Sequence, residues 1–400
     1  MGVTIDQQAF RAYLEEQPVI SSHCHHLKAD EHQGMGLSGL LRQSYVNWCH
    51  VPVPEGDDPK AIENWLRAVG TRGYFVWLEK ALMDIYGISE RISASSWESF
   101  DRAIRLAHQD PDWHLKLLRD KCRYEAVFMD AYWAPGDDHG HPELFKPVYR
   151  VNSLFYGYNQ SAMDHNGNNF QRLEGTHIAD IDEYLQTMER VLREKKRAGC
   201  VAFKCALAYD RGLDFGPGNR AQAQKAMGQH PEAADIRAFQ NLVMDKICQV
   251  AEEINIPMQM HTGLGLMNQS RAMVLQPLIA RYPQVTFLMM HGGYPWTSDI
   301  PGLCHVYANV WVDLCWLPLI STSAAVRFLD ELIDVCNADR IIWGCDNWTG
   351  EESYAARLAF LEVLTRVLTG RVETGLMRAD DARRFGRMVL HDNARALLNR

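Results

Sequence analysis

The sequence has no excess of basic residues and no paired-cysteine motif. Its 41 Lys and Arg are outnumbered by 50 Asp and Glu, which gives a formal net charge of −9. Because nucleic-acid binding needs clustered cations that neutralise phosphates, this balance argues against a nucleic-acid partner. The 10 cysteines form no C-x-x-C pair, so they resemble neither a zinc ribbon nor a disulfide framework. They suit a reducing compartment, and we expect the protein in the cytoplasm.

The sequence also lacks long hydrophobic runs. No stretch approaches the roughly 18 uninterrupted apolar residues of a membrane span, and the first residues do not form the basic start and apolar run of a secretory signal. We therefore expect no membrane partner. The 400 residues, 47% of them hydrophobic, are enough for a large core. The partners that we expect are a small-molecule substrate and further copies of the chain in a homo-oligomer.

Eight short apolar runs, rich in β-branched and aromatic residues, recur along the chain. The later runs are each followed by a segment with helical periodicity, which is typical of βα units on a parallel sheet. The sequence therefore predicts an α/β fold, a (β/α)8 TIM barrel. The predicted strands are residues 18–23, 124–130, 148–154, 200–205, 257–262, 285–291, 309–315 and 341–346. The clearest predicted helices are residues 180–198, 232–254, 322–336 and 379–398.

The segment between the first two predicted strands, residues 27–120, is far too long for a single connection. Leu, Ile, Trp and Phe recur in it at helical spacing. We predict one barrel built from residues 1–26 and 121–400, with residues 27–120 as a helical insertion on the first βα loop. That loop opens at the rim where barrel active sites are built, so the insertion could act as a lid. Equally, it could pack on the side of the barrel or make an oligomer contact.

Four of the 16 histidines and one aspartate stand at the ends of predicted strands. His23 and His25 end the first run, and their spacing of two places both side chains on one face. His261, His291 and Asp346 end the fifth, sixth and eighth runs. In a barrel these strand ends converge at one rim, where burying the groups together without a cation would be costly. The combined pattern predicts a metal site, although the first pair alone could equally be structural.

This pattern resembles the amidohydrolase superfamily of metal-dependent TIM barrels. The segments HTGLG, LIARYPQVTFLMMHGGYPW, NVWVDLCW and GCDNW look most similar to the amidohydrolase-related branch that includes the domain fused to glutamine-synthetase-like proteins. The sequence departs from that fused architecture because it has no glutamine-synthetase domain. The His-Cys-His phrase and the long helical insert after it also resemble uronate isomerases.

The resemblance implies a divalent metal, one ion or two, with Zn as the first candidate and Mn or Fe as alternatives. The implied ligands are His23, His25, His261 and Asp346. With two ions His291 would be a further ligand, whereas with one ion it is free to polarise a carbonyl or to move a proton.

Lys204, at the end of the fourth strand, matches the position where two-metal members carry a carboxylated lysine that bridges the ions. Carboxylation would turn an unfavourable buried ammonium into an anionic ligand. Two alternatives stay open: a cationic Lys204 that binds a substrate carboxylate, and a structural ion pair.

The rim of the predicted barrel offers cations and aromatic rings for a small, carboxylate-bearing substrate. Arg150 or Arg211 could clamp a carboxylate with two parallel hydrogen bonds. Tyr209, Trp296 and Trp348 could enclose an apolar portion. Equally, the aromatic rings could pack the rim and the arginines could pair with neighbouring aspartates.

We predict a metal-dependent hydrolase that cleaves an amide or related C–N bond, a bond type that rests on the family resemblance. Asp346 and His291 are the predicted catalytic residues: Asp346 accepts the proton of the attacking water and later protonates the leaving nitrogen, while His291 or a second ion polarises the carbonyl. Three alternatives stay open because one barrel serves many reactions: a decarboxylase, a uronate-isomerase-like sugar-acid isomerase and a non-catalytic metal-binding barrel.

Overall fold

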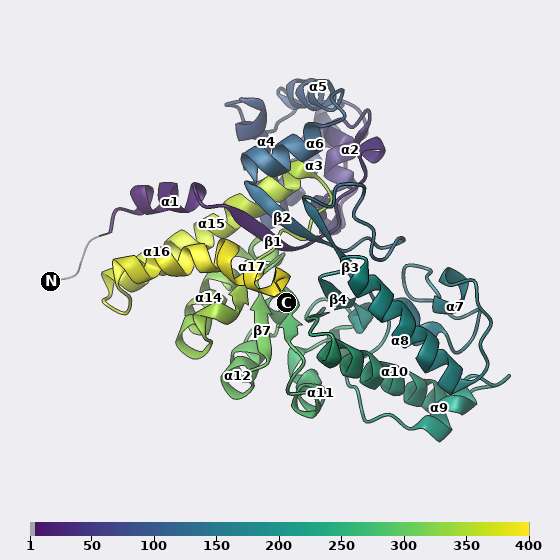
Figure 1. The fold of residues 1–400 in the computed structure, drawn as a ribbon. Helices are drawn as coiled ribbons and strands as arrows, with labels where there is room; N and C mark the ends of the chain where they lie inside the picture. Colours follow the sequence, from purple (N-terminus) through teal and green to yellow (C-terminus); the bar gives the residue numbers. More distant parts are fainter. Residues whose placement is uncertain (1–4, 400) are drawn as a thin grey trace. The chain divides into compact units, whose positions relative to one another are not determined.

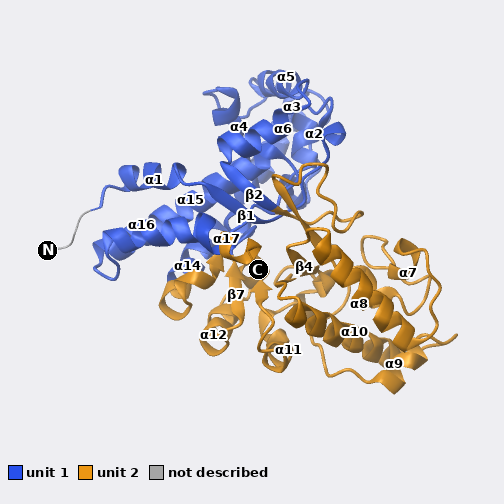
Figure 2. Cartoon of the chain, viewed as in Figure 1, with its two compact units in different colours: residues 1–127, 314–330, 343–394 blue, residues 128–313, 331–342, 395–400 orange. Residues whose placement is uncertain are grey.

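The computed structural model describes residues 5–399, so residues 1–4 and 400, at the two ends of the predicted barrel, lie outside the described part. Its strands follow one another in a single sheet in the order β1 to β8, and helices alternate with them (Figure 1). The predicted (β/α)8 barrel with a helical insertion after the first strand is confirmed. The chain divides into two compact units, shown in Figure 2: unit 1 contains residues 1–127, 314–330 and 343–394, and unit 2 contains residues 128–313, 331–342 and 395–400.

The eight strands are short and almost entirely buried, as expected for a parallel sheet covered on both faces. They are β1 (Val19–Cys24), β2 (Tyr124–Met129), β3 (Phe145–Arg150), β4 (Ala202–Cys205), β5 (Met258–Met260), β6 (Phe287–Met289), β7 (Val310–Asp313) and β8 (Ile341–Ile342). All eight lie where the sequence predicts them, except that β3 begins before residue 148. In unit 2 the parallel register sets Lys204 on β4 opposite Arg150 on β3 and Gln259 on β5.

Unit 1 is built around α15, a helix buried along most of its length that packs against α1 and α4. The segment between β1 and β2 is helical and belongs to this same unit. The helices that lie wholly in unit 1 are α1 (Gln7–Glu15), η1 (Ala29–His32), α2 (Leu37–Arg42), η2 (Tyr45–Cys49), α3 (Pro59–Val69), α4 (Gly73–Tyr86), α5 (Trp97–Ala107), α6 (Trp113–Lys116), η3 (Leu117–Lys121), α13 (Leu317–Ile320), α15 (Gly350–Glu373), α16 (Ala379–Arg387) and η10 (Met388–Asp392).

Unit 2 carries strands β3 to β8 with their connecting helices, among which α8 and α10 run side by side (Figure 1). The Asp180 side chain caps α8, whose first turn is acidic and last turn basic, as its dipole favours. Its helices are η4 (Asn152–Tyr156), α7 (Phe170–Leu173), α8 (Ile181–Arg197), η5 (Leu207–Tyr209), α9 (Arg220–Ala226), α10 (Ala233–Glu253), η6 (Met267–Gln269), η7 (Ala272–Leu275), α11 (Gln276–Arg281), η8 (Met290–Gly293), α12 (Asp299–Val306) and η9 (Ala338–Arg340).

Two further helices, α14 (Thr322–Val335) and α17 (Asn393–Leu398), each have residues in both units. Among residues 5–399, no helix combines the length and the apolar character that a bilayer crossing needs.

Candidate active site

In unit 1 the end of β1 is held beside the segment that follows β8. The backbone amides of Ser22 and His25 donate to the carbonyls of Trp343 and Asn347 at 3.2 and 3.0 Å, and the amide of Asp346 donates to the carbonyl of His23 at 2.9 Å. Side chains add to this pairing, since the Ser21 hydroxyl accepts from the amide of Cys345 at 3.0 Å. Backbone pairing thus fixes Asp346 next to the two histidines of β1.

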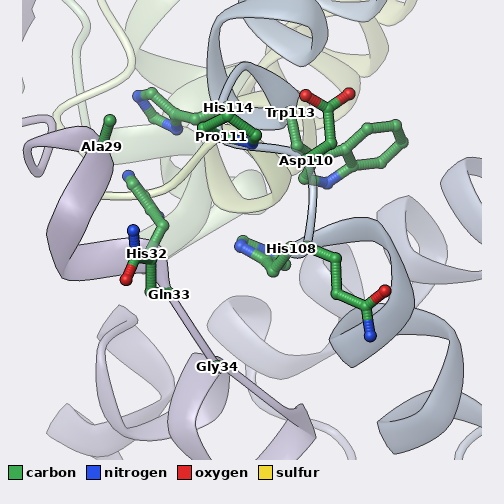
Figure 3. Close-up of a pocket in the computed structure, with 10 residues that line it drawn as sticks. Ala29, His32, Gln33, Gly34, His108, Asp110, Pro111, Trp113 and His114 are labelled. Carbon is green, nitrogen blue, oxygen red and sulfur yellow. The ribbon is translucent and has the colours of Figure 1, made fainter.

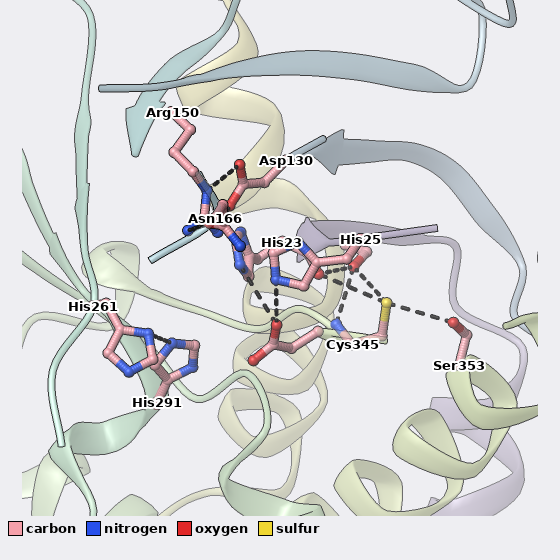
Figure 4. Close-up of polar contacts among 11 residues, drawn as sticks. His23, His25, Asp130, Arg150, Asn166, His261, His291, Cys345 and Ser353 are labelled. Atoms are coloured by element: carbon pink, nitrogen blue, oxygen red, sulfur yellow. Dashed lines mark hydrogen bonds and ion pairs between the residues drawn. The ribbon is translucent and has the colours of Figure 1, made fainter. Parts of the chain in front are cut away.

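His23, His25 and Asp346 are buried and lie close together; Figure 4 shows the two histidines. The carboxylate oxygen Oδ1 of Asp346 lies 3.1 Å from Nε2 of His25 and 3.5 Å from Nε2 of His23, and the two imidazole rings meet edge to face at 4.7 Å. Asp346 has a left-handed backbone with φ of 58°, which aspartate tolerates better than most residues. Two imidazole nitrogens and one carboxylate oxygen are a donor set that suits a divalent transition metal.

An aromatic cluster of unit 1 adjoins His25. The Trp348 ring stacks on His25 at 6.0 Å, and the Tyr45 ring lies 4.8 Å from Trp348 and 4.8 Å from Trp316. Trp48, 42% exposed, packs edge-on against Trp316 at 5.5 Å. Trp348 is predicted from the sequence, whereas Tyr45, Trp48 and Trp316 are not. Tyr45 and Trp48 stand far from the strand ends in the sequence, so spacing gives no signal for them, whereas Trp316 directly follows the seventh predicted strand and could have been found there.

In unit 2 the histidines that follow β5 and β6 form a hydrogen-bonded pair (Figure 4). Nε2 of His261 lies 2.7 Å from the carbonyl oxygen of Leu264, which can only accept, so this nitrogen carries a proton. Burial and the Lys204 ammonium hold the pKa of His261 well below its usual range, so its ring is neutral. Its Nδ1 therefore accepts from Nε2 of His291 at 2.8 Å.

Lys204 and Arg150 are buried neighbours at the ends of β4 and β3. Lys204 is only 1% exposed, which is unusual for an amine. The Arg150 guanidinium donates from Nε and Nη2 to the two carboxylate oxygens of Asp130, at 3.1 and 2.6 Å (Figure 4). It also lies 4.5 Å from the Tyr132 ring. Asp130 is missing from the sequence-based candidates, although it is the last residue of the second predicted strand and the strand-end rule could have found it.

The other predicted substrate contacts have defined places in unit 2. The Tyr209 ring lies 4.5 Å from His261, while Arg211 donates to Gln240 and to the carbonyls of Gly212 and Asp214. Trp296 lies beside Arg271. Whether these residues contact a substrate stays a prediction.

A further acid and base pair of unit 2 has no counterpart among the predicted residues. Asp210 accepts hydrogen bonds from Nδ2 of Asn152 and Nδ1 of His165, each at 2.9 Å, and the His165 ring packs 5.1 Å from Tyr209. Both residues lie in loops after strands rather than at the strand ends, which is why the strand-end pattern misses them.

Comparison with known proteins places these residues in a wider context. The amidohydrolase family model matches residues 48–400. Protein fluG of Emericella nidulans is 29% identical over 221 residues, which are 49% of this chain and 25% of that protein, so the match spans about a quarter of the relative's length.

Two solved structures share the fold along almost the whole chain. The uronate isomerase of Thermotoga maritima has a TM-score of 0.76 and 17% identity, with 99% of this chain and 98% of that chain covered. The glucuronate isomerase of Caulobacter crescentus has a TM-score of 0.77 and 14% identity, with coverage of 98% and 93%. The fold, the strand-end ligand types and the match over residues 48–400 show that the chain belongs to the amidohydrolase family of metal-dependent TIM-barrel enzymes.

Proposed function

We propose that the protein is a metal-dependent hydrolase that cleaves an amide or related C–N bond of a small, carboxylate-bearing molecule. The observation that carries the proposal is the convergence of two imidazoles on one carboxylate oxygen of Asp346. Nε2 of His25 lies 3.1 Å from this oxygen, and Nε2 of His23 lies 3.5 Å from it. A buried carboxylate between two imidazoles is the donor set that holds a divalent ion in hydrolytic enzymes. Membership of the amidohydrolase family supports hydrolysis over other chemistry.

His23, His25 and Asp346 would hold the ion, with Zn as the first candidate. A divalent cation in such a donor set supplies Lewis-acid activation of water and of a carbonyl oxygen. Asp346 accepts the proton that the attacking water loses and delivers it to the leaving nitrogen, so that the proton count balances over one turnover. Its placement by backbone bonds to β1 keeps the carboxylate in position through both transfers.

His291 is the second group to which we assign a role in proton transfer. Since its Nε2 donates to His261, the neutral form of His291 has an unprotonated Nδ1 that can accept a proton. His261 in turn is fixed in one tautomer by the carbonyl of Leu264. Ligation of an ion by His261, His291 or a carboxylated Lys204 stays a prediction, as do the substrate contacts of Arg150, Tyr209, Arg211, Trp296 and Trp348.

The second candidate function is aldose–ketose isomerisation of a sugar acid. Two uronate isomerases match this chain end to end in fold, and a common barrel accommodates either reaction. Decarboxylation remains a third possibility on the same reasoning about barrels. The three are separated by product, since hydrolysis releases an amine, isomerisation converts a hexuronate to its keto form and decarboxylation releases CO₂.

The experiment that tests the proposal combines metal content with a substrate screen. We expect at least one equivalent of divalent metal per chain in the wild type, and release of free amine from some members of a panel of N-acyl amino acids and cyclic amides. Asp346→Asn should lower turnover by at least 1,000-fold, in the range for loss of a general base together with a ligand. Circular dichroism and the unfolding temperature report whether the variant keeps its fold.

Asp380→Asn is the matched control, because the Asp380 side chain is 95% exposed on α16. It should keep both metal and activity. The metal content of Lys204→Ala distinguishes a one-ion site from a two-ion site. Loss of one of two metal equivalents per chain supports a Lys204 that bridges two ions. Full activity of Asp346→Asn, or of metal-free enzyme, contradicts the proposal, and turnover of hexuronates without amine substrates replaces it with isomerisation.

A further inference from the structure

A second group of histidines lies in unit 1, apart from the pair on β1. His32, His108 and His114 line one cavity of about 450 Å³ (Figure 3). His32 ends η1, the first helix after β1, while His108 follows α5 and His114 belongs to α6. Three segments of the chain thus bring imidazoles to the same opening.

The three rings are packed as a stack. The His32 ring lies 4.3 Å from His114 and 5.8 Å from His108, with interplanar angles of 25° and 29°. His26 meets His114 edge-on at 4.8 Å and extends the cluster toward β1. Burying four imidazoles together costs more free energy than burying apolar side chains of similar size, because polar groups lose their hydrogen bonds to water.

His32 is the member of the cluster for which this cost is clearest. It is 5% exposed, and neither of its ring nitrogens has a hydrogen-bond partner among the described residues. A buried imidazole without partners loses the hydrogen bonds that water supplies to it in the unfolded chain. The His32 side chain lines the cavity, so a ligand bound there would give the imidazole a partner once the ring turns toward it.

His108 has the orientation expected of a metal ligand. Its Nε2 lies 2.8 Å from Oε1 of Glu351, which as a carboxylate can only accept, so Nε2 carries the proton and Nδ1 keeps a free electron pair. The same oxygen accepts from the Tyr86 hydroxyl at 2.8 Å and from Trp113 Nε1 at 3.2 Å, and so is firmly held. A carboxylate that fixes one nitrogen of a histidine whose other nitrogen binds a metal is the usual arrangement in metalloproteins.

We propose that His32, His108 and His114 form a second metal site that takes a divalent first-row transition ion, with imidazole nitrogens as ligands. Imidazole suits Zn, Cu and Ni, and excludes Mg and Ca as the preferred occupants. The rings stack in the structure, so binding requires them to turn about their side-chain torsions toward the cavity that they line. A bound ion would fasten η1, which follows the strand of His23 and His25, to α5 and α6 of the insertion.

The test uses full-length protein stripped of metal by chelation and titrated with Zn²⁺, and it needs no substrate. We expect wild type to bind one more equivalent than His32→Phe, or to bind that equivalent at least tenfold more tightly, with a rise in unfolding temperature that the variant lacks. Phe keeps the ring stack but removes both nitrogens. His230→Phe, at an exposed position, is the matched control and should behave as wild type.

A second comparison distinguishes this site from the one at Asp346. Asp346→Asn should keep the equivalent that depends on His32, whatever happens to activity, so failure of the proposed hydrolase function leaves this test intact. In case His32→Phe does not fold, Cu²⁺ spectra of the triple variant His23→Gln, His25→Gln and Asp346→Asn provide an independent measure. The imidazoles of β1 are then gone, and coordination by several imidazoles at the second site splits the paramagnetic resonance signal. Equal stoichiometry and affinity in wild type and His32→Phe, or a copper signal without nitrogen coupling, overturns the proposal.

Discussion

At the scale of single residues, several buried carboxylates are each surrounded by hydrogen-bonding or imidazole partners. Asp346 faces two imidazoles, Asp130 accepts two hydrogen bonds from Arg150, and Glu351 accepts from three donors. A buried carboxylate is tolerated only when its partners replace the water that it loses. Each of these sites is therefore sensitive to the loss of one partner, and to protonation of the carboxylate.

Glu351 allows this sensitivity to be measured. Burial alone would raise its pKa, but the hydrogen bonds from His108 and Tyr86 lower the pKa of Glu351 to about 2. Since the folded pKa lies below the unfolded value, Glu351 stabilises the fold above about pH 4.5 and loses that contribution as the pH falls toward 2. The full contribution is on the order of 3 kcal/mol. We expect Glu351→Gln to lower the free energy of unfolding at pH 7 by about that amount, measured by urea denaturation.

The acid range provides the check on this interpretation. The difference between wild type and Glu351→Gln should narrow as the pH falls from 5 to 3, because protonation removes the charge from the wild type as well. Glu362→Gln is the control on the same helix, since Glu362 makes partly exposed ion pairs with Arg366 and Arg11, each worth about 0 to 1 kcal/mol. A difference between wild type and Glu351→Gln that does not change with pH would contradict the assigned pKa.

The candidate residues show where strand-end reasoning succeeds and where it stops. His23, His25 and Asp346 come together because each ends an apolar run, and the period of two in a strand is visible in the sequence. Tyr45, on the helix η2 of the insertion, and His165, in a loop, are missed because their positions depend on packing that local sequence does not encode. Their place beside His25 and Tyr209 needs the tertiary structure.

At the scale of elements, the regular pattern of βα units made the sheet predictable. The helices α8 and α10 differ by only a residue or so at each end from the predicted ranges, because each has a polar start and an apolar stripe. The predicted helix 379–398 is divided in the structure into α16, a π-helical turn and α17. Helix α15 is absent from the sequence-based assignment, since it is buried nearly all round and has no polar face to mark its period.

The turn after β5 is the element on which the histidine pair depends. Gly263 has φ of 93°, and a Cβ at this position would lie 2.3 Å from the carbonyl oxygen of Tyr294, in the loop that follows His291. Gly263→Ala therefore strains the backbone and pushes apart the two loops that carry His261 and His291. We expect a loss of at least 2 kcal/mol in unfolding free energy and at least a tenfold loss of activity in an assay established by the substrate screen.

Gly375→Ala is the control that distinguishes backbone strain from a steric clash of the added Cβ. Gly375 also has a positive φ, 77°, but a Cβ there would meet nothing within 4 Å. This control should cost about 1 kcal/mol through backbone strain alone and leave activity unchanged. If Gly263→Ala lowers the unfolding free energy no more than Gly375→Ala does, the close approach of the two loops does not contribute to stability.

At the scale of the whole molecule, buried contacts join the insertion to the rest of unit 1. The amide of Tyr45 donates to the Glu352 carboxylate at 2.7 Å, Tyr86 donates to Glu351, and Trp77 donates to the Thr322 hydroxyl at 2.8 Å. Helix α4 also packs along α15. Of the two roles considered for residues 27–120, these contacts favour packing within the unit over a lid that swings as one body, because opening would expose buried carboxylates and an apolar helix face.

Removal of residues 27–120, with a short Gly/Ser linker in their place, tests this view of the molecule. Glu351 and Glu352 would lose their donors from the insertion, and α15 would lose the cover of α4, so we expect no soluble protein with a cooperative unfolding transition. The control keeps every contact but breaks the chain: a protease site placed after the exposed Gly56 is cut in the folded protein. The two fragments should then migrate together in gel filtration, since packing rather than connectivity holds the insertion in place. A deleted chain that unfolds cooperatively would instead make residues 27–120 a domain of their own. Cut fragments that separate without denaturant would show that packing alone does not hold the insertion in place.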